Sequence, residues 1–360
     1  MNIEPLRLYV DPDLIAEGLD YVLILYPFWG TIHKKETPYN EKTVSDHGFD
    51  KRYATLVSSI DESEYVLVPH DYWHIKEKHP ELLHRIVEKA QAHEKPLLID
   101  ASGDRHGEVK IPHSRVLRIN QYRFDLPAHE ITMPIPCEDL LESYAGGLFV
   151  EREKREIPSV GFVGWGSVHF KQRVRTFIKE IPLRILILLK SHYKVYKKGV
   201  FWREKAINIM QASSLVDSQF IIRSSYSGHT NTLKGDPQKN RQEFVANILN
   251  SDYTLIIRGD ANAATRFYET LSLGRIPLFL DTACVLPLED VIDYKEFCVF
   301  VDYSDIHDLP KILADFHYSL STEQFIAMQR KARYVFEHYL RYDSFSPYLV
   351  QALRENKPSA

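Results

Sequence analysis

The sequence has little of what a disulfide scaffold, a membrane-spanning protein or a nucleic-acid-binding protein requires. Its three cysteines lack metal-type spacing and cannot form a disulfide framework, which points to a reducing compartment. No stretch approaches the roughly 20 apolar residues that cross a bilayer, and the N-terminus has no basic region before an apolar core. A net charge of −4 argues against duplex nucleic acid, because a phosphate backbone demands a broad basic face. We therefore expect a cytoplasmic protein that does not bind nucleic acid.

Residues spaced to bind a metal ion are also missing. The 16 histidines include no H-E-x-x-H motif or other spaced ligand set. The Asp-x-Asp sequence Asp11-Pro12-Asp13 contains a proline and is followed by the helix-like LIAEGL, so it indicates a helix N-cap rather than a manganese site. We expect no metal ion and no cofactor. If the reaction releases a phosphate group, we expect arginines to neutralise its charge instead of a metal ion.

What the sequence does have is an alternation of strand-like and helix-like segments, in a chain of 360 residues that can form two domains. Strands are predicted at residues 21–26, 65–68, 96–100, 116–119, 160–163, 185–189, 220–223, 253–257, 276–280 and 299–301, and helices at 51–59, 80–93 and 322–353. This alternation predicts parallel sheets with helices on both faces. The charged run EREKRE is the best linker. We place one domain at residues 1–154, a second at 155–335, and a terminal helix at 336–360 that crosses back to the first.

The segment Asp252 to Asp281 is the most informative part of the chain, because it predicts a complete βαβ unit. Arg258 and Arg266 flank the loop before its helix, where free backbone N–H groups and the helix dipole favour a phosphate. Glu269 lies one turn beyond Arg266 and could accept hydrogen bonds from the two hydroxyls of a ribose. The alternative is that Arg266 and Glu269 form an ordinary ion pair on the helix surface.

The motifs of this unit, RGD followed by RFYETL and SLGRIPLFLD, resemble the nucleotide-sugar-binding segment of exostosin-like glycosyltransferases. The resemblance continues through residues 286–301 and 328–339, and EYVLVPHDYW at 64–73 is similar to a strand and loop of the family's N-terminal domain. It covers most of residues 60–340. Ala263-Ala264 replace small or hydroxyl residues of the family, and Thr270 stands where alanine is common, but neither change removes a charged contact.

The resemblance implies the GT-B fold, in which two Rossmann-like parallel-sheet domains face an interdomain cleft. It implies an inverting glycosyltransferase that moves a sugar from a nucleotide diphosphate donor, with UDP expected, to a hydroxyl of a saccharide or glycolipid acceptor. Two alternatives stay open. One is a catalytically silent GT-B module that binds a glycan or a partner glycosyltransferase, and the other is a nucleotide-sugar epimerase.

Further donor-binding residues are expected at the carboxyl ends of the second domain's strands. Gly164 and Gly166 follow the predicted strand 160–163, and they could let a loop approach the diphosphate or the sugar. Arg223 ends another predicted strand and should reach the same crevice. The alternatives are a purely structural glycine turn and an arginine that does not contact ligand.

A basic stretch precedes these arginines. Residues 171–205 contain eleven Lys or Arg and two acidic residues. Such a run is most often a solvated face. The alternative is peripheral docking on anionic lipid headgroups or on a phosphate-bearing acceptor.

The first domain is expected to supply the base that takes a proton from the acceptor. The sequence VPHDYW places His70 and Asp71 at the carboxyl edge of the first sheet. We favour Asp71, because a carboxylate stays available as a base throughout neutral pH. The alternative is that this pair caps the following helix. Asp100 and Asp104, after the next strand, are rival candidates.

Overall fold

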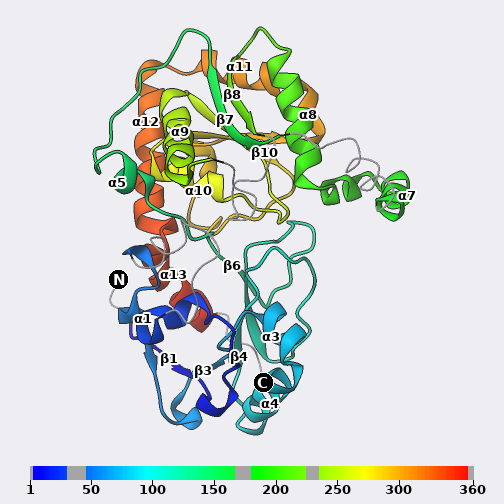
Figure 1. The fold of residues 1–360 in the computed structure, drawn as a ribbon, viewed down its shortest axis with the longest axis vertical. Helices are drawn as coiled ribbons and strands as arrows, with labels where there is room; N and C mark the ends of the chain where they lie inside the picture. The colour runs from blue at the N-terminus through cyan, green and yellow to red at the C-terminus, as the bar shows by residue number, and fades with distance from the viewer. Residues whose placement is uncertain (1–2, 31–45, 167–179, 224–234, 356–360) are drawn as a thin grey trace.

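The computed structural model describes residues 3–30, 46–166, 180–223 and 235–355, which form two α/β domains stacked end to end (Figure 1). The N-terminal sheet has the strand order β2-β1-β3-β4-β5-β6, with β1 at Leu6–Tyr9, β2 at Ala54–Leu56, β3 at Tyr65–Leu67, β4 at Leu97–Asp100, β5 at Ser114–Arg118 and β6 at Glu130–Thr132. The C-terminal sheet has the order β11-β10-β9-β7-β8, with β7 at Ser159–Trp165, β8 at Asp217–Arg223, β9 at Tyr253–Ile256, β10 at Ile276–Asp281 and β11 at Val299–Asp302. Every pairing between these strands is parallel. This is the GT-B architecture expected from the sequence.

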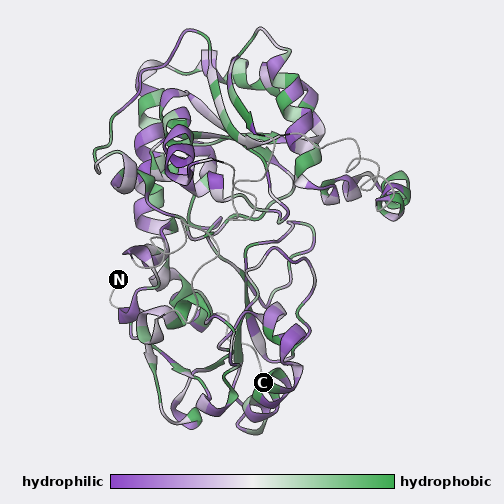
Figure 2. Ribbon diagram, in the orientation of Figure 1, coloured by the Kyte–Doolittle hydropathy of each residue, from purple (hydrophilic) through white to green (hydrophobic). Residues whose placement is uncertain are grey.

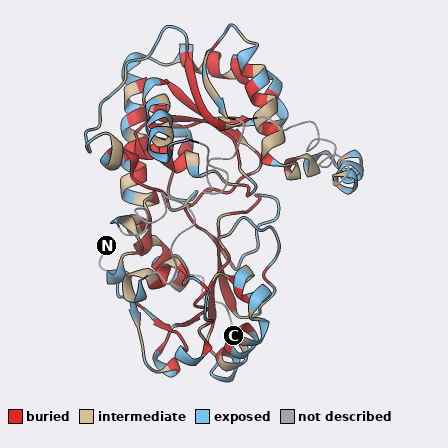
Figure 3. Ribbon diagram, viewed as in Figure 1, coloured by how far each residue is buried: buried red, intermediate tan, exposed pale blue. Residues whose placement is uncertain are grey.

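Helices surround both sheets and leave the central strands buried, while the edge strands β2, β6 and β8 are more exposed (Figure 3). They are α1 at Tyr26–Trp29, α3 at Tyr72–Lys78, α4 at Pro80–Ala92, α5 at Leu140–Tyr144, α7 at Ile181–Leu189, α8 at Gly199–Gln211, α9 at Pro237–Asn250, α10 at Thr265–Ser272, α11 at Leu309–Ser319, α12 at Thr322–Val335 and α13 at Tyr342–Glu355. In Figure 1, α9, α10 and α12 lie to the left of the C-terminal sheet, and α8 and α11 lie to its right. Both faces of this sheet are therefore covered, as a parallel sheet requires.

Three predictions of secondary structure are wrong, for local reasons. Residues 185–189 belong to helix α7 and not to a strand, because Pro182 at the helix start and a leucine-rich sequence favour helix. Within residues 21–26, Leu23–Leu25 form a 3₁₀ helix that leads into α1, which starts at Tyr26. The predicted helix at 51–59 contains strand β2, which pairs with β1. A short apolar run does not distinguish helix from strand by periodicity alone.

The last helix, α13, completes the hydrophobic core of the N-terminal domain. Its apolar side chains Tyr342, Phe345, Leu349, Val350 and Leu353 pack with residues of β1, β3, β4 and β5. The hydroxyl of Tyr65 in β3 donates a hydrogen bond to the carbonyl of Leu353 at 2.6 Å. The chain therefore returns to its first domain after it has built the second. No helix of the described ranges is both long and apolar enough to cross a bilayer.

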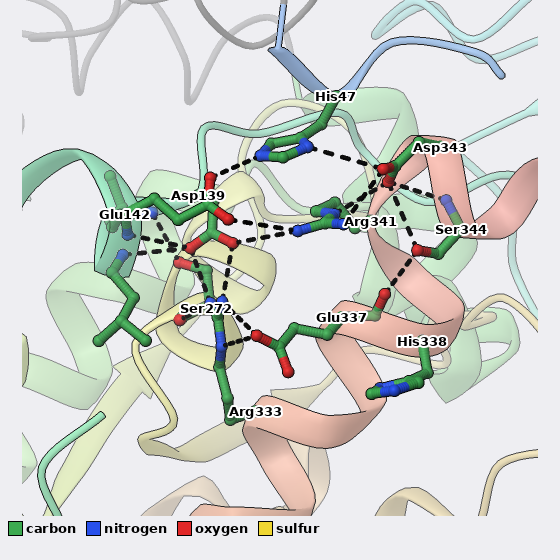
Figure 4. Close-up of polar contacts among 12 residues, drawn as sticks. His47, Asp139, Glu142, Ser272, Arg333, Glu337, His338, Arg341, Asp343 and Ser344 are labelled. Carbon is green, nitrogen blue, oxygen red and sulfur yellow. Dashed lines mark hydrogen bonds and ion pairs between the residues drawn. The ribbon is translucent and has the colours of Figure 1, made fainter. Parts of the chain in front are cut away.

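A polar cluster with a buried centre at Asp139 and Arg333 joins the two domains where the chain crosses between them (Figure 4). Asp139, before α5, accepts hydrogen bonds from Arg333 of α12 through both carboxylate oxygens, at 2.7 and 2.9 Å. His47 lies 2.8 Å from Glu142 and 3.6 Å from Asp343. Burial alone would raise the pKa of Asp343, but hydrogen bonds from His47 and Arg341 lower it to about 2. These ion pairs hold both crossing segments together.

We predict that truncating one side chain of α13 destabilises the N-terminal domain. Phe345 is 2% exposed, so Phe345→Ala should lower the free energy of unfolding by about 3–5 kcal/mol, from lost burial and the cavity left behind. Gln351→Ala, on the exposed face of the same helix, is the matched control and should change stability little. Urea unfolding followed by circular dichroism measures both. Equal stabilities would show that α13 does not contribute to this core.

Candidate active site

A cleft of about 690 Å³ lies between the carboxyl ends of the two sheets, within the size range of ligand pockets. Its N-terminal wall contains Asp104, which follows β4, Ile119, which follows β5, and residues 135–138. Its C-terminal wall contains the ends of β7 and β8, the loop after β9 and the first turns of α10. Open parallel sheets bind ligands at this edge, where the order of the strands reverses. Four arginines line the cleft: Arg203, Arg223, Arg241 and Arg266.

Arg266 is a partly buried cation at the wall of this cleft. Its Nη2 donates a hydrogen bond to the carbonyl of Val163 at 2.5 Å, and its guanidinium lies 4.2 Å from the ring centre of Phe162. Its Nε is buried without a hydrogen-bond partner among the described residues. Burial, together with Arg203, lowers the pKa of Arg266 to about 9. A nearby anion would relieve both the desolvation and the repulsion.

Gly164 makes this position of Arg266 possible. A Cβ on Gly164 would lie 2.9 Å from Nη2 of Arg266, and the backbone φ of +153° is one that L side chains rarely adopt. Gly166 is different, because its Cβ would lie 2.6 Å from Cδ1 of Ile207 in α8. Gly166 does not line the cleft and serves the packing of a helix on the sheet, so the structure does not support its predicted contact with a donor.

Glu269 also lines the cleft, but its ion-pair partner is not Arg266. It accepts from Nη1 of Arg241, in α9, at 2.6 Å, and Glu138 lies 3.4 Å from the same guanidinium. Although burial opposes it, the pKa of Arg241 is raised by these two carboxylates. The helix-surface ion pair considered for Arg266 and Glu269 is therefore not what the structure contains. Arg241 and Glu138 hold the carboxylate of Glu269 in place.

Arg223 reaches the cleft at the end of β8, as predicted. One of its guanidinium nitrogens lies 2.7 Å from Glu243 and 3.2 Å from the carbonyl of Asn240, both in α9. Arg223 therefore lies at the rim, with part of its charge balanced.

Arg258 does not line the cleft, although the sequence predicted it beside the phosphate. It is 7% exposed, and its Nη1 donates to the hydroxyl of Tyr122 at 2.6 Å and to the carbonyl of Val195 at 3.0 Å. Its Nη2 donates to the carbonyl of Asp260 at 2.8 Å. Its guanidinium thus bonds to one acceptor of the N-terminal domain, Tyr122, and to two carbonyls of the C-terminal domain, Val195 and Asp260. Arg258 therefore links the two domains through hydrogen bonds.

Neither His70 nor Asp71 is placed to act as the base. His70 is completely buried: its Nε2 accepts from the backbone of Ala16 and its Nδ1 lies 2.9 Å from the carbonyl of Asp20. Both ring nitrogens are therefore occupied, and burial lowers the pKa of His70. Asp71 caps α3 by accepting from two backbone N–H groups, at 3.0 and 3.1 Å, which is the alternative considered above. Neither residue lines the cleft.

Of the rival carboxylates, Asp104 lines the cleft and Asp100 does not. Asp100 accepts hydrogen bonds from the backbone and hydroxyl of Ser102, and burial raises its pKa to about 6. Burial also raises the pKa of Asp104, with a further contribution from Asp260. Asp104 thus brings a carboxylate of raised proton affinity from the first domain to the donor side.

The charged cleft residues Arg203, Arg241 and Glu138 were not found from the sequence. Arg203 lies in α8, within the basic stretch 171–205. Because it is one of eleven Lys or Arg in that stretch, the sequence does not distinguish it as a cleft residue. Arg241 and Glu138 are contributed by a helix and by the linker before α5, and no spacing relates them to the βαβ unit. Only the folded chain brings them to Glu269.

One trio of side chains in the described ranges has donor atoms close enough to hold a metal ion, namely His47, Asp139 and Glu142. It lies at the domain junction and not in the cleft (Figure 4). Arg333 already binds both oxygens of Asp139.

The chain is similar to known glycosyltransferases over its C-terminal domain. Residues 203–316 match the Exostosin GT47 domain, and this range contains Arg203, Arg223, Arg241, Arg266 and Glu269. Exostosin-1 of Drosophila melanogaster is 30% identical over 99 residues, which are 28% of this chain and 12% of that protein. The Exostosin-1 homolog of Caenorhabditis elegans is 28% identical over 108 residues, 30% of this chain and 27% of that protein. A probable arabinosyltransferase of Arabidopsis thaliana, ARAD1, is 28% identical over 107 residues, 30% of this chain and 24% of that protein.

The matched segments thus cover between 12% and 27% of these relatives' lengths. Among solved structures, a glycosyltransferase from Rickettsia africae aligns over the whole of both chains with a TM-score of 0.37 and 9% identity. The sequence resemblance to exostosin-like glycosyltransferases is confirmed for the domain that contributes the arginines.

We predict that the hydrogen bond between Tyr122 and Arg258 stabilises the protein without taking part in ligand binding. Tyr122→Phe keeps the ring and removes the hydroxyl, and loss of a buried bond to a charged group should lower the free energy of unfolding by about 1.5–3 kcal/mol. Tyr318→Phe, at a tyrosine that is 58% exposed, is the control. Urea unfolding and UDP calorimetry distinguish the two roles. A large loss of UDP affinity with unchanged stability would contradict this prediction and show that Arg258 takes part in ligand binding.

Proposed function

We propose that this chain, whose residues 203–316 form an exostosin-type domain, is a glycosyltransferase that takes a sugar from a nucleotide diphosphate donor. We take UDP as the nucleotide and a hydroxyl of a saccharide or lipid-linked saccharide as the acceptor. The observation that carries the proposal is the cleft itself: it faces both sheets and has on its C-terminal wall Arg266, whose Nε is buried without a hydrogen-bond partner among the described residues.

The donor's diphosphate would bind between Arg266 and Arg203. Repulsion from Arg203 contributes to the lowered pKa of Arg266, so an anion placed between them would gain from both charges. Arg223 would approach the same phosphates from the rim. Positive charge fixed in advance stabilises the nucleoside diphosphate as it departs, which is the task that a divalent ion performs elsewhere. We therefore propose transfer without a metal ion.

Glu269 would accept hydrogen bonds from the ribose hydroxyls. Its carboxylate lies one helical turn from Arg266 and is held by Arg241 at 2.6 Å, so little ordering would be needed when the nucleotide binds. A ribose at Glu269 and a diphosphate at Arg266 would place the sugar toward the N-terminal wall.

Asp104 would act as the general base of an inverting reaction. The acceptor oxygen attacks the anomeric carbon while the bond from that carbon to the phosphate oxygen breaks, the hydroxyl proton passes to Asp104, and UDP leaves with the bonding electrons. Burial raises the pKa of this carboxyl toward the working pH, which suits a group that must both accept and release a proton.

Two other functions give different products. A catalytically silent GT-B module would bind UDP without turnover, and an epimerase would convert the donor to an isomer without an acceptor. Product analysis with and without saccharide acceptors separates all three.

We predict that donor binding depends on Arg266 and Glu269 and survives EDTA. Arg266→Ala and Glu269→Gln should each weaken UDP binding about tenfold to a hundredfold, because each loses a hydrogen bond that involves a charge. Arg330 lies in the same domain as Arg266 and forms an exposed ion pair with Glu151. Arg330→Ala should leave the affinity unchanged. Isothermal calorimetry in EDTA measures these affinities, and thermal melting shows whether each variant is folded. Folded variants with parental affinity would refute the site.

We predict that Asp104→Asn lowers kcat by about 10²–10⁴-fold while UDP affinity stays within a factor of about three. Asp71→Asn makes the same exchange outside the cleft and keeps a side chain that can cap α3, so it should have near-normal kcat. Because burial raises the pKa of Asp104, the rate of the parent protein should fall with decreasing pH earlier than an ordinary aspartate would require. A loss of kcat in Asp71→Asn alone would show that Asp71 and not Asp104 is the base.

A further inference from the structure

Helix α7 is an apolar helix that leaves most of its side chains exposed. None of its nine residues, all of which the structure describes, is buried, and Leu188 and Leu189 are 86% and 74% exposed. Figures 1 and 2 show it as a hydrophobic segment that projects from the side of the molecule, near the level of the domain junction. A cluster of exposed large aliphatic side chains on a projecting element indicates a binding surface.

The charges around α7 are mostly positive, and Glu180, at the N-cap of the helix, is the acidic residue next to them. Residues 181–198 contain no Asp or Glu and five cations, which are Arg184, Lys190, Lys194, Lys197 and Lys198. Burial, with Arg184 and Lys194 nearby, lowers the pKa of Lys197. The cations are therefore close enough to repel one another, and they surround an apolar helix with positive charge.

We propose that α7 inserts into the headgroup and acyl boundary of an anionic lipid bilayer. Nine helical residues extend only about 14 Å, which is too short to cross the hydrocarbon core but enough to lie within the interface. Exposed leucines enter the acyl region, and lysines around them attract anionic lipid headgroups. A second copy of this chain fits less well, because a symmetric contact through α7 would bring the cations of both copies together.

The position of α7 connects the membrane with the cleft. It packs against the 3₁₀ helix η5 at Ser191–Tyr196, whose Val195 carbonyl accepts the hydrogen bond from Arg258. The ring of Tyr196 lies 4.7 Å from that of Tyr122 in the N-terminal domain. Helix α8 follows directly, and its Arg203 lines the cleft. If the proposed transferase function holds, a bilayer at α7 would present a lipid-linked acceptor beside the active site.

The test is co-sedimentation of the full chain with vesicles of phosphatidylcholine, with or without phosphatidylglycerol. The parent protein should bind the anionic vesicles more strongly, and the preference should decrease with salt. The double variant Leu188→Asp/Leu189→Asp should bind at least about tenfold more weakly. Lys190→Glu/Lys194→Glu should lose the preference for phosphatidylglycerol. Leu148→Asp/Val150→Asp, at exposed apolar residues elsewhere, is the matched control and should bind as the parent does.

UDP calorimetry on the same variants keeps the two proposals separate. All variants should bind UDP with parental affinity, which also shows that they are folded. Absence of binding to anionic vesicles by the parent protein, or equal binding by the Leu188→Asp/Leu189→Asp variant, would overturn the lipid assignment. So would a concentration-dependent dimer, measured by sedimentation velocity, that this variant abolishes without any vesicle binding. Failure of UDP binding alone would overturn the transferase proposal and leave the membrane result intact.

Discussion

A buried seam of hydrogen bonds between the two domains fixes the geometry of the cleft. Residues 120–123 of the first domain bond to the loops after β9 and β10 of the second. The backbone N–H of Asn262 donates to Asn120 at 2.7 Å, its side-chain amide donates to the carbonyl of Gln121, and the backbone of Arg123 donates to Ala283. Asn120, Gln121 and Asn262 are buried, so losing one partner of these bonds would leave the other partner unsatisfied. The width of the cleft therefore depends on these contacts.

The arginines of the cleft differ in how their charges are balanced. Buried arginines are costly unless anions face them, and here Arg241 has Glu269 and Glu138 while Arg223 has Glu243. Among the residues that the structure describes, Arg266 contacts a carbonyl and an aromatic ring and has no carboxylate within hydrogen-bond reach. Such an arrangement is retained at a cost in stability, which fits a residue whose counter-ion arrives with a ligand.

The sequence predicts the architecture well and the site in part. Alternation of apolar strands and amphipathic helices is a local property, so most strands and both sheets could be read from it. Arg266 and Glu269 were found because the loop and helix of a βαβ unit place them at the carboxyl edge of the sheet. Arg258 was misplaced because spacing gives the position of a residue along a loop but not the direction of its side chain, which the acceptors Tyr122 and Val195 decide. The positions of His70 and Asp71 were predicted wrongly for a similar reason. His70 is hydrogen-bonded to the backbone of Ala16, and Asp71 to the backbone at the start of α3, so neither side chain points into the cleft.

The return of α13 to the first domain has a consequence for how the chain is made. The N-terminal sheet is synthesised before the C-terminal domain, yet five side chains of its core belong to residues 342–353, which are synthesised after that domain. Domains of most multidomain proteins can fold in order as they emerge. Here the first domain cannot complete its core until residues 342–353 have been synthesised. Until then it keeps an exposed apolar face. The nascent first domain is thus the part of this protein that most needs protection from aggregation by a chaperone.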